Sequence, residues 1–140
     1  MKPIFACLVI AVSFFVQPLL ACSCLQEADI ETGVPLALQQ ADAVFLGNVV
    51  SVEKDRISEF ETYETTVFAV QSKWKGALGA TLTTRILTTC CLCGYQFSVG
   101  RAYLVYAKQA HNGQYRVSTC SRTKHGDQAK AELRFLRSHD

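Results

Sequence analysis

Cysteine is the residue that most limits how this chain can fold. The chain of 140 residues has seven cysteines, of which Cys7 lies in an apolar segment at the start. The other six gather near residue 22 and between residues 90 and 120: Cys22, Cys24, Cys90, Cys91, Cys93 and Cys120. An even number of cysteines in an exported chain indicates disulfide bonds, which persist in an oxidising compartment. Six cysteines allow many pairings, and their spacing alone selects none of them.

Residues 1–21 have the pattern of a secretory signal peptide. A basic residue precedes an apolar run over residues 4–16, and the small Ala21 comes directly before the expected cut. This run is shorter than the roughly 20 apolar residues that a membrane-spanning helix needs. We therefore expect residues 1–21 to be removed and residues 22–140 to form one domain, secreted to an extracellular or periplasmic space.

The charge balance gives no sign of a strongly charged partner. Removing residues 1–21 takes one lysine from the 14 basic residues and none of the 12 acidic ones, which leaves a net charge of +1. A balance this close to neutral does not build an electrostatic surface for nucleic acid or for an anionic membrane. We expect a monomer that binds neither.

Alternating apolar residues predict that most of the domain is built from strands. The first strand places four apolar residues on one face: Val44, Leu46, Val50 and Val52. The second places three on one face: Phe68, Val70 and Trp74. The expected strands cover residues 43–52, 62–74, 82–89, 102–107 and 114–119, with a charged loop over residues 53–61. Asn112-Gly113 predicts a tight turn before the last strand, because Asn-Gly tolerates positive φ.

Helices are expected only at the two ends of the domain. The first covers residues 35–41 and can bury Leu36, Leu38 and Ala41. The closing helix begins with Asp127 as its N-cap and can bury Ala131, Leu133 and Leu136. Five strands with short turns favour a closed barrel, because closure removes exposed strand edges. We predict a mainly β fold: a five-stranded Greek-key barrel of the oligonucleotide/oligosaccharide-binding (OB) type, with a small sandwich as the alternative.

The residues that usually carry catalysis form no recognisable set. The three histidines, His111, His125 and His139, lie in polar or terminal stretches, and no nucleophile or carboxylate accompanies them at a known spacing. No glycine-rich phosphate loop is present. The two closely spaced sets of cysteines, Cys22/Cys24 and Cys91/Cys93, have the spacing Cys-x-Cys rather than the Cys-x-x-Cys of common zinc sites. We therefore expect no enzyme and no metal or cofactor of the protein's own.

The expected mature terminus offers a different chemistry. A free α-amine on Cys22 has an ordinary pKa of about 7.7–8.0, so part of it is neutral near pH 7. Together with its own carbonyl oxygen, that amine forms a five-membered chelate for a metal with an open position. Catalytic zinc keeps such a position for water. A rigid Cys22-Ser23-Cys24 terminus is therefore able, in principle, to displace this water and block a zinc enzyme.

Six short stretches share their order and spacing with a known family over most of residues 22–122. They are Cys22-Ser23-Cys24, residues 41–47, Trp74-Lys75-Gly76, Cys93-Gly94-Tyr95, residues 103–107 and Ser118-Thr119-Cys120-Ser121. With them the chain resembles the N-terminal, netrin-like domain of the tissue inhibitors of metalloproteinases (TIMPs), in particular the short single-domain bacterial forms. The resemblance implies a five-stranded barrel and the disulfides Cys22–Cys93 and Cys24–Cys120.

The resemblance also implies a function, the inhibition of a metalloendopeptidase. In the family, the amine and carbonyl of the first cysteine bind the catalytic zinc of the target, a role that falls to Cys22. The second residue points into the first primed specificity pocket, a role that falls to Ser23. The rest of the implied protease-binding ridge is Cys24, Leu25, Gln26, Leu92 and Cys93. The zinc belongs to the target protease, which is the expected partner.

The chain departs from the family at its other cysteines. The animal inhibitors have a second cysteine-rich subdomain and a third disulfide from the first helix, whereas this chain has no cysteine between Cys24 and Cys90. Cys90 and Cys91 are additional. A bond between these two neighbours, two free thiols, and competition with Cys93 all stay open.

The segment before Cys22 supports an alternative. Leu19-Leu20-Ala21-Cys22 resembles a bacterial lipobox, in which Cys22 would carry lipid on its sulfur and an acyl group on its amine. Cys22 then neither pairs with another cysteine nor chelates zinc, and the protein is a lipid-anchored, or otherwise a secreted, netrin-like binding module without inhibitory activity. Lipidation of Cys22 leaves an odd number of cysteines for disulfides, whereas cleavage without lipid leaves an even number. The even number favours a free terminus at Cys22.

Overall fold

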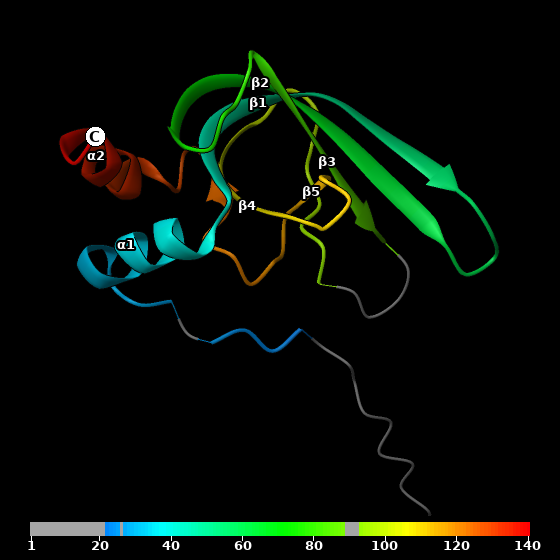
Figure 1. Cartoon of the computed structure of the whole chain (residues 1–140), viewed down its shortest axis with the longest axis horizontal. Coiled ribbons are helices and arrows are strands. Elements are labelled where there is room, and N and C mark those ends of the chain that lie inside the picture. Colours follow the sequence, from blue (N-terminus) through cyan, green and yellow to red (C-terminus); the bar gives the residue numbers. More distant parts are fainter. Residues whose placement is uncertain (1–21, 26, 89–92) are drawn as a thin grey trace, which may run out of the picture.

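The computed structural model describes residues 22–25, 27–88 and 93–140 and is mainly β with two helices (Figure 1). The prediction of a mainly β fold is confirmed. The elements are α1 (Ile30–Gln40), β1 (Ala43–Arg56), β2 (Thr62–Lys75), β3 (Thr81–Leu87), β4 (Ala102–Gln109), β5 (Tyr115–Arg116), β6 (Lys124–His125) and α2 (Lys130–Ser138). None of the helices in these ranges is long and apolar enough to span a membrane.

Five strands close into a ring in the order β1-β2-β3-β5-β4, because β1 pairs with β4 as well as with β2. The pairing is antiparallel except between β3 and β5, which meet in parallel at Thr84 and Tyr115. β6 pairs with Tyr103 and Leu104 of β4, on the edge of β4 opposite β1. Only the first half of β1, up to Asn48, pairs with β4. The rest of β1 continues with β2 as a ribbon that projects from the ring (Figure 1).

The ring encloses the first of two hydrophobic clusters. Phe68 lies at its centre, with the Phe45 ring 5.4 Å and the Phe97 ring 4.8 Å from its own, both edge to face. Phe97 meets Tyr103 in the same way at 4.9 Å. Edge-to-face pairs add to the stabilisation that burial of the rings already gives. The other buried members are Ala43, Val49, Leu78, Leu82, Val105, Ala107 and Val117.

The second cluster lies between the outer face of the ring and the two helices, which lie side by side against β1 and β4 (Figure 1). Val44 and Leu104 contribute from the strands, Val34 from α1, and Leu133 and Leu136 from α2. Because both faces of β1 are covered here, its first residues are all buried rather than alternating. The expected half-buried strand is therefore wrong for the start of β1.

Three register shifts between β1 and β2, after Val44, Leu46 and Val49, change which residues share a face. Between Val49 and Ser51 the register of β1 against β2 shifts, so Val50 is 56% exposed while Val52 packs on the ring cluster. Trp74 lies between the partners of Val44 and Phe45, and it packs against the second cluster rather than against that of Phe68. Both predicted faces are therefore wrong in part, because a bulge inserts a residue and reverses the alternation after it.

The boundaries of several elements differ from the predicted ones. β1 and β2 extend through the charged stretch and leave only residues 57–61 as the loop, because charged residues are tolerated on a projecting ribbon. α1 begins at Ile30, since Asp29 caps it, and Leu36 is exposed. The last predicted strand is reduced to β5, and the predicted turn before it is present, with Gly113 at φ 81°.

Asp127 does not cap the closing helix. The N-cap of α2 is Ala129, without a side-chain cap, and the backbone N–H of Ala129 donates to His125 and Gly126. A main-chain turn thus separates Asp127 from the helix. Ala131, predicted to be available for burial, is exposed.

The ring cluster predicts a large difference between two phenylalanines. Phe68→Ala should lower the free energy of unfolding by about 3–5 kcal/mol, because it leaves a cavity among buried rings. Phe60→Ala, in the ribbon loop, should change it by less than about 0.5 kcal/mol, because Phe60 is 76% exposed. Urea denaturation of both variants measures this. Equal effects would contradict the placement of Phe68 at the centre of the core.

Candidate functional site: the disulfide-anchored N-terminal ridge

Residues Cys22–Leu25, here called the N-terminal ridge, lie exposed on the surface. Cys22 is bonded to Cys93 and Cys24 to Cys120, with Cα–Cα distances of 5.6 and 5.1 Å. These are the two pairings that the family resemblance implies. They join residues 71 and 96 positions apart in the sequence. In the chain-entropy model each closed loop of that length contributes about 4 kcal/mol.

The two cysteines that hold the ridge belong to paired segments. Gly94 and Ser118 form an antiparallel bridge. On one side of it Tyr95 N–H donates to the Val117 carbonyl at 2.9 Å, and on the other Thr119 N–H donates to the Cys93 carbonyl at 2.8 Å. Cys93 and Cys120 are therefore held at a fixed spacing. Because Cys22 and Cys24 are bonded to these two cysteines, their positions are fixed as well. Ser23 lies exposed between the two bonds.

The chain that follows the ridge is held by two cations. Glu27 forms an ion pair with Lys124 at 3.0 Å, and the Ala28 carbonyl accepts a hydrogen bond from Arg122 Nη1 at 2.8 Å. Gly33 in α1 faces the same contact, since a Cβ there would overlap the Arg122 guanidinium and the Ala28 carbonyl oxygen. A glycine is thus required for α1 to approach Arg122 this closely.

Asp29 fixes the point where the extended chain turns into α1. Its carboxylate accepts hydrogen bonds from Thr32 N–H at 2.8 Å and from the Thr32 hydroxyl at 2.6 Å. These bonds lower the pKa of the Asp29 carboxyl from its ordinary value. Asp29 is therefore the N-cap of α1, and Arg122 binds the residue directly before it, Ala28.

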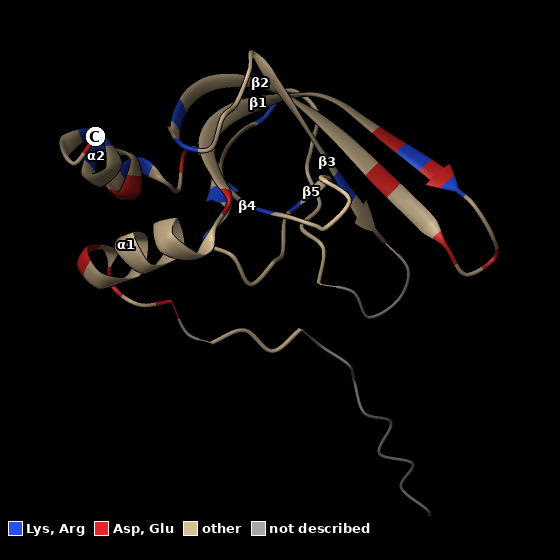
Figure 2. Cartoon of the chain, in the orientation of Figure 1, with Lys and Arg blue, Asp and Glu red and all other residues tan. Residues whose placement is uncertain are grey.

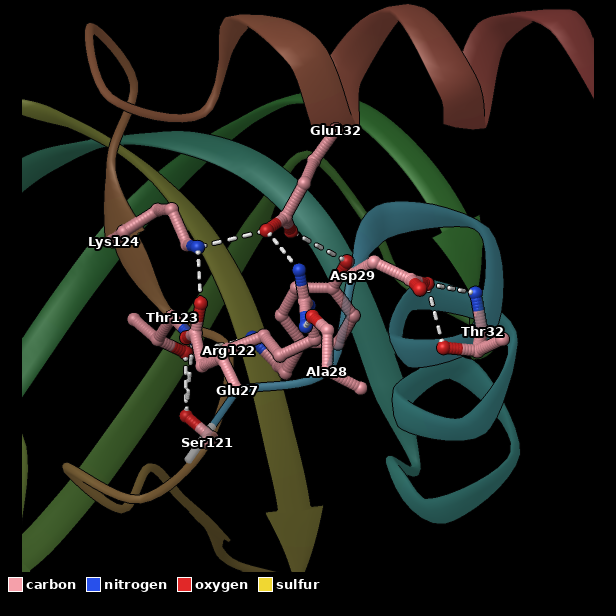
Figure 3. Close-up of polar contacts among 10 residues, drawn as sticks. Glu27, Ala28, Asp29, Thr32, Ser121, Arg122, Thr123, Lys124 and Glu132 are labelled. Atoms are coloured by element: carbon pink, nitrogen blue, oxygen red, sulfur yellow. Dashed lines mark hydrogen bonds and ion pairs between the residues drawn. The ribbon is translucent and has the colours of Figure 1, made fainter. Parts of the chain in front are cut away.

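Arg122 and Lys124 both bind one buried carboxylate, that of Glu132 (Figure 3). Arg122 Nη2 and Lys124 Nζ each lie 2.7 Å from Glu132 Oε1, and the Tyr106 hydroxyl donates to Oε2 at 3.3 Å. Glu132 comes from α2, Tyr106 from β4 and Lys124 from β6. With 3% of its surface exposed, Glu132 joins the N-terminal segment to the C-terminal helix.

Proton affinities in this cluster follow from burial and from the charge of Glu132. Burial raises the pKa of Tyr106 well above its ordinary value, and the neighbouring Glu132 raises it further. Burial by itself would lower the pKa of Arg122 and of Lys124. The hydrogen bonds and negative charge of Glu132, together with Glu27, outweigh burial and raise both.

The structure places only part of the predicted ridge. It brings Cys22, Ser23, Cys24 and Cys93 together, and Leu25 extends the ridge with 96% of its surface exposed. The remaining predicted residues lie outside the described part of the chain: the segment 1–21, Gln26, Cys90, Cys91 and Leu92. No group of three or more His, Cys, Asp or Glu side chains within the described residues is placed to hold a metal ion.

Sequence reasoning missed the cluster around Glu132, although a signal was present. Ala129, Glu132, Leu133 and Leu136 follow one another at helical spacing, so the pattern puts one carboxylate on the apolar face of the closing helix. A charge on such a face has to be paired. His125, from a polar stretch of the sequence, is half-buried, and its ring lies 4.4 Å from that of Tyr103.

Removing the central charge should destabilise the whole domain. Glu132→Gln leaves Arg122 and Lys124 without their shared carboxylate, and loss of one partner of a buried ion pair costs about 3–5 kcal/mol. Glu27→Gln removes a half-exposed partner of the same lysine and should cost less than about 1 kcal/mol. Urea denaturation of the two variants tests this. Similar values for both would show that Glu132 is not the centre of the cluster.

The same cluster predicts a loss of stability at alkaline pH. Folding raises the pKa of Tyr106 and of Lys124 above the ordinary values of 10.0 and 10.5. The stabilisation that comes from these raised values is complete below the ordinary values and is lost as pH rises through the folded ones. The free energy of unfolding should therefore fall above about pH 10, less steeply in Tyr106→Phe. Urea denaturation from about pH 8 to pH 11 measures both slopes, and equal slopes would contradict a role for Tyr106.

No protein-family model matches the chain, and no curated protein matches it either. What the ridge does is therefore inferred from its own residues and contacts. The structure establishes an exposed segment with two disulfide anchors, and the chain that follows it is bound at Glu27 and Ala28 by the cations of the Glu132 cluster.

Proposed function

We propose that the protein is a secreted inhibitor of zinc metalloendopeptidases that binds the target's catalytic zinc through the main chain of Cys22. The observation that carries the proposal is the N-terminal ridge. Cys22 and Cys24 are both bonded to the domain while the ridge itself stays exposed. A segment held in this way loses little conformational entropy when it enters a cleft, which is where tight binding gains most.

The chelating atoms are the Cys22 amine, created by the cut before this residue, and the Cys22 carbonyl oxygen. They occupy the position that catalytic zinc keeps for water. The side chain of Ser23, between the two anchors, enters the first specificity pocket beside the zinc. Leu25, Gln26, Leu92 and Cys93 extend the contact along the cleft. The protein contributes no catalytic residue and no metal of its own.

We further propose that the ring is an OB-type barrel of the netrin-like kind. Three observations support this proposal: the strand order β1-β2-β3-β5-β4, the pairing of β1 with both of its neighbours, and the bulges that curve β1 around the core. The two disulfides fit a chain that folds in an oxidising compartment. They also support secretion, which residues 1–21 would direct.

The first test blocks the proposed chelate. The mature chain beginning at Cys22 should inhibit a zinc metalloendopeptidase from a panel assayed with a fluorogenic peptide. One extra alanine before Cys22 should weaken inhibition by at least about a hundredfold, because the amine becomes an amide that cannot bind zinc. An alanine added after Asp140 is the matched control and should have no effect. Equal inhibition by both extended forms would refute the chelate.

The intact mass of the protein from its native host separates this proposal from the lipid-anchored alternative. An inhibitor should have the mass of residues 22–140 less two hydrogens for each disulfide. A mass increased by acyl chains would mean that the Cys22 amine is blocked and would overturn the proposal. The bond from Cys22 to Cys93 supports the free form, because a sulfur in a disulfide cannot also carry lipid.

A further inference from the structure

A cavity of about 540 Å³ opens beside the segment that anchors the ridge. It lies between the end of β3, β5 and the end of β4, and Cys93 and Gly94 form part of its wall. The side chains that matter for its chemistry are Tyr63, Arg85, Lys108, Gln114, Arg116 and Ser118. Three of these are cations, and no carboxylate is among the described residues that line the cavity.

Arg85 is the least exposed of the three cations. Its guanidinium lies over the Tyr63 ring, 4.5 Å from the centroid. Arg85 Nε is enclosed by protein and has no hydrogen-bond acceptor among the described residues. An aromatic ring holds a guanidinium in place and leaves its net charge intact. The Arg85 charge is therefore positioned but has no carboxylate partner in the described part of the chain.

The other two cations add to the positive charge of the cavity. Arg116 on β5 is exposed, and no ion pair is found for it within the described ranges. Lys108 on β4 reaches Asp42 only at 4.0 Å, with both side chains about half exposed, so this pair neutralises it weakly. Figure 2 shows basic residues on β3, β4 and β5, the strands that contribute Arg85, Lys108 and Arg116 to the cavity. Gln114 and Ser118 supply neutral hydrogen-bond donors.

The position of the cavity connects it to the ridge. Cys93 lines the cavity and is also the disulfide partner of Cys22. Ser118 lines it as well and pairs with Gly94 across the bridge that fixes the ridge. A protein that binds the ridge at Cys22 therefore lies next to the cavity wall at Cys93.

We propose that this cavity binds an aspartate or glutamate side chain of the protein that the ridge engages. The inference rests on the proposed function for the identity of that partner. A carboxylate matches the planar guanidinium of Arg85 in a bidentate geometry, and Arg116 and Lys108 complete its neutralisation. The cavity then selects, among proteases with an accessible zinc, those that carry an acidic residue at the rim of the cleft.

The probe is a capped tetraglutamate peptide, titrated at low salt into the isotope-labelled mature protein and followed by NMR. We expect shifts at the cavity residues, with Arg85→Gln and Arg116→Gln each weakening binding by about tenfold, since each removes a charge-assisted hydrogen bond. Arg101→Gln, at an exposed basic residue outside the cavity, is the matched control and should bind like the wild type. Added salt should weaken binding throughout.

Several results would overturn the proposal: shifts away from the cavity, no shifts at all, equal losses in all three variants, or a response to inorganic phosphate but not to the peptide. Thermal unfolding of each variant shows that it is folded.

The form with alanine before Cys22 separates the two proposals, because it should bind the peptide without inhibiting a protease. Inhibition without peptide binding refutes the cavity alone. Peptide binding with no inhibition by the mature chain refutes the zinc chelate and, with it, the partner.

Discussion

A single buried carboxylate connects the two ends of the domain. Glu132 on α2 accepts from Arg122 and Lys124 at 2.7 Å, and these two cations hold the chain that leads from the ridge into α1. A buried ion pair of this kind contributes little net stability compared with apolar packing, but it is costly to break. Through these cations Glu132 connects α2 to the chain that follows the ridge.

The ridge is held from two sides by different physical means. On one side the disulfides of Cys22 and Cys24 connect it to the paired segments around Gly94 and Ser118. On the other side Arg122 binds Ala28, and Asp29 ends the extended chain by capping α1. The disulfides act mainly by restricting the unfolded chain, whereas the polar contacts act in the folded state. Together they leave an exposed segment of four residues with little freedom, the property on which the proposed inhibitory role depends.

Local pattern predicted the strand-rich composition and the approximate place of each strand of the ring, because apolar residues alternate wherever one face is buried. It failed at particular residues for identifiable reasons. Bulges break the alternation after Val49 in β1 and between Val70 and Trp74 in β2. The ring cluster also buries Ala43 and Phe45, which lie on the face of the first strand that was expected to be exposed. Asp127 was expected to cap the closing helix, but the main-chain turn at residues 125–129 puts Ala129 in that position. The first helix was expected to begin at residue 35, and its cap at Asp29 was missed.

The sequence by itself determined the cysteine positions, the mainly β composition and the presence of one carboxylate on the apolar face of the last helix. Spacing could not choose among the cysteine pairings, and the choice that the family resemblance implied is the one in the structure. The tertiary structure alone decided that Glu132 meets cations from another element, that Gly33 lets α1 approach Arg122, and that basic residues of three strands surround one cavity beside Cys93. The contacts of Gly33 and the cavity bring together residues distant in the sequence, and all of these contacts depend on how the helices and strands pack.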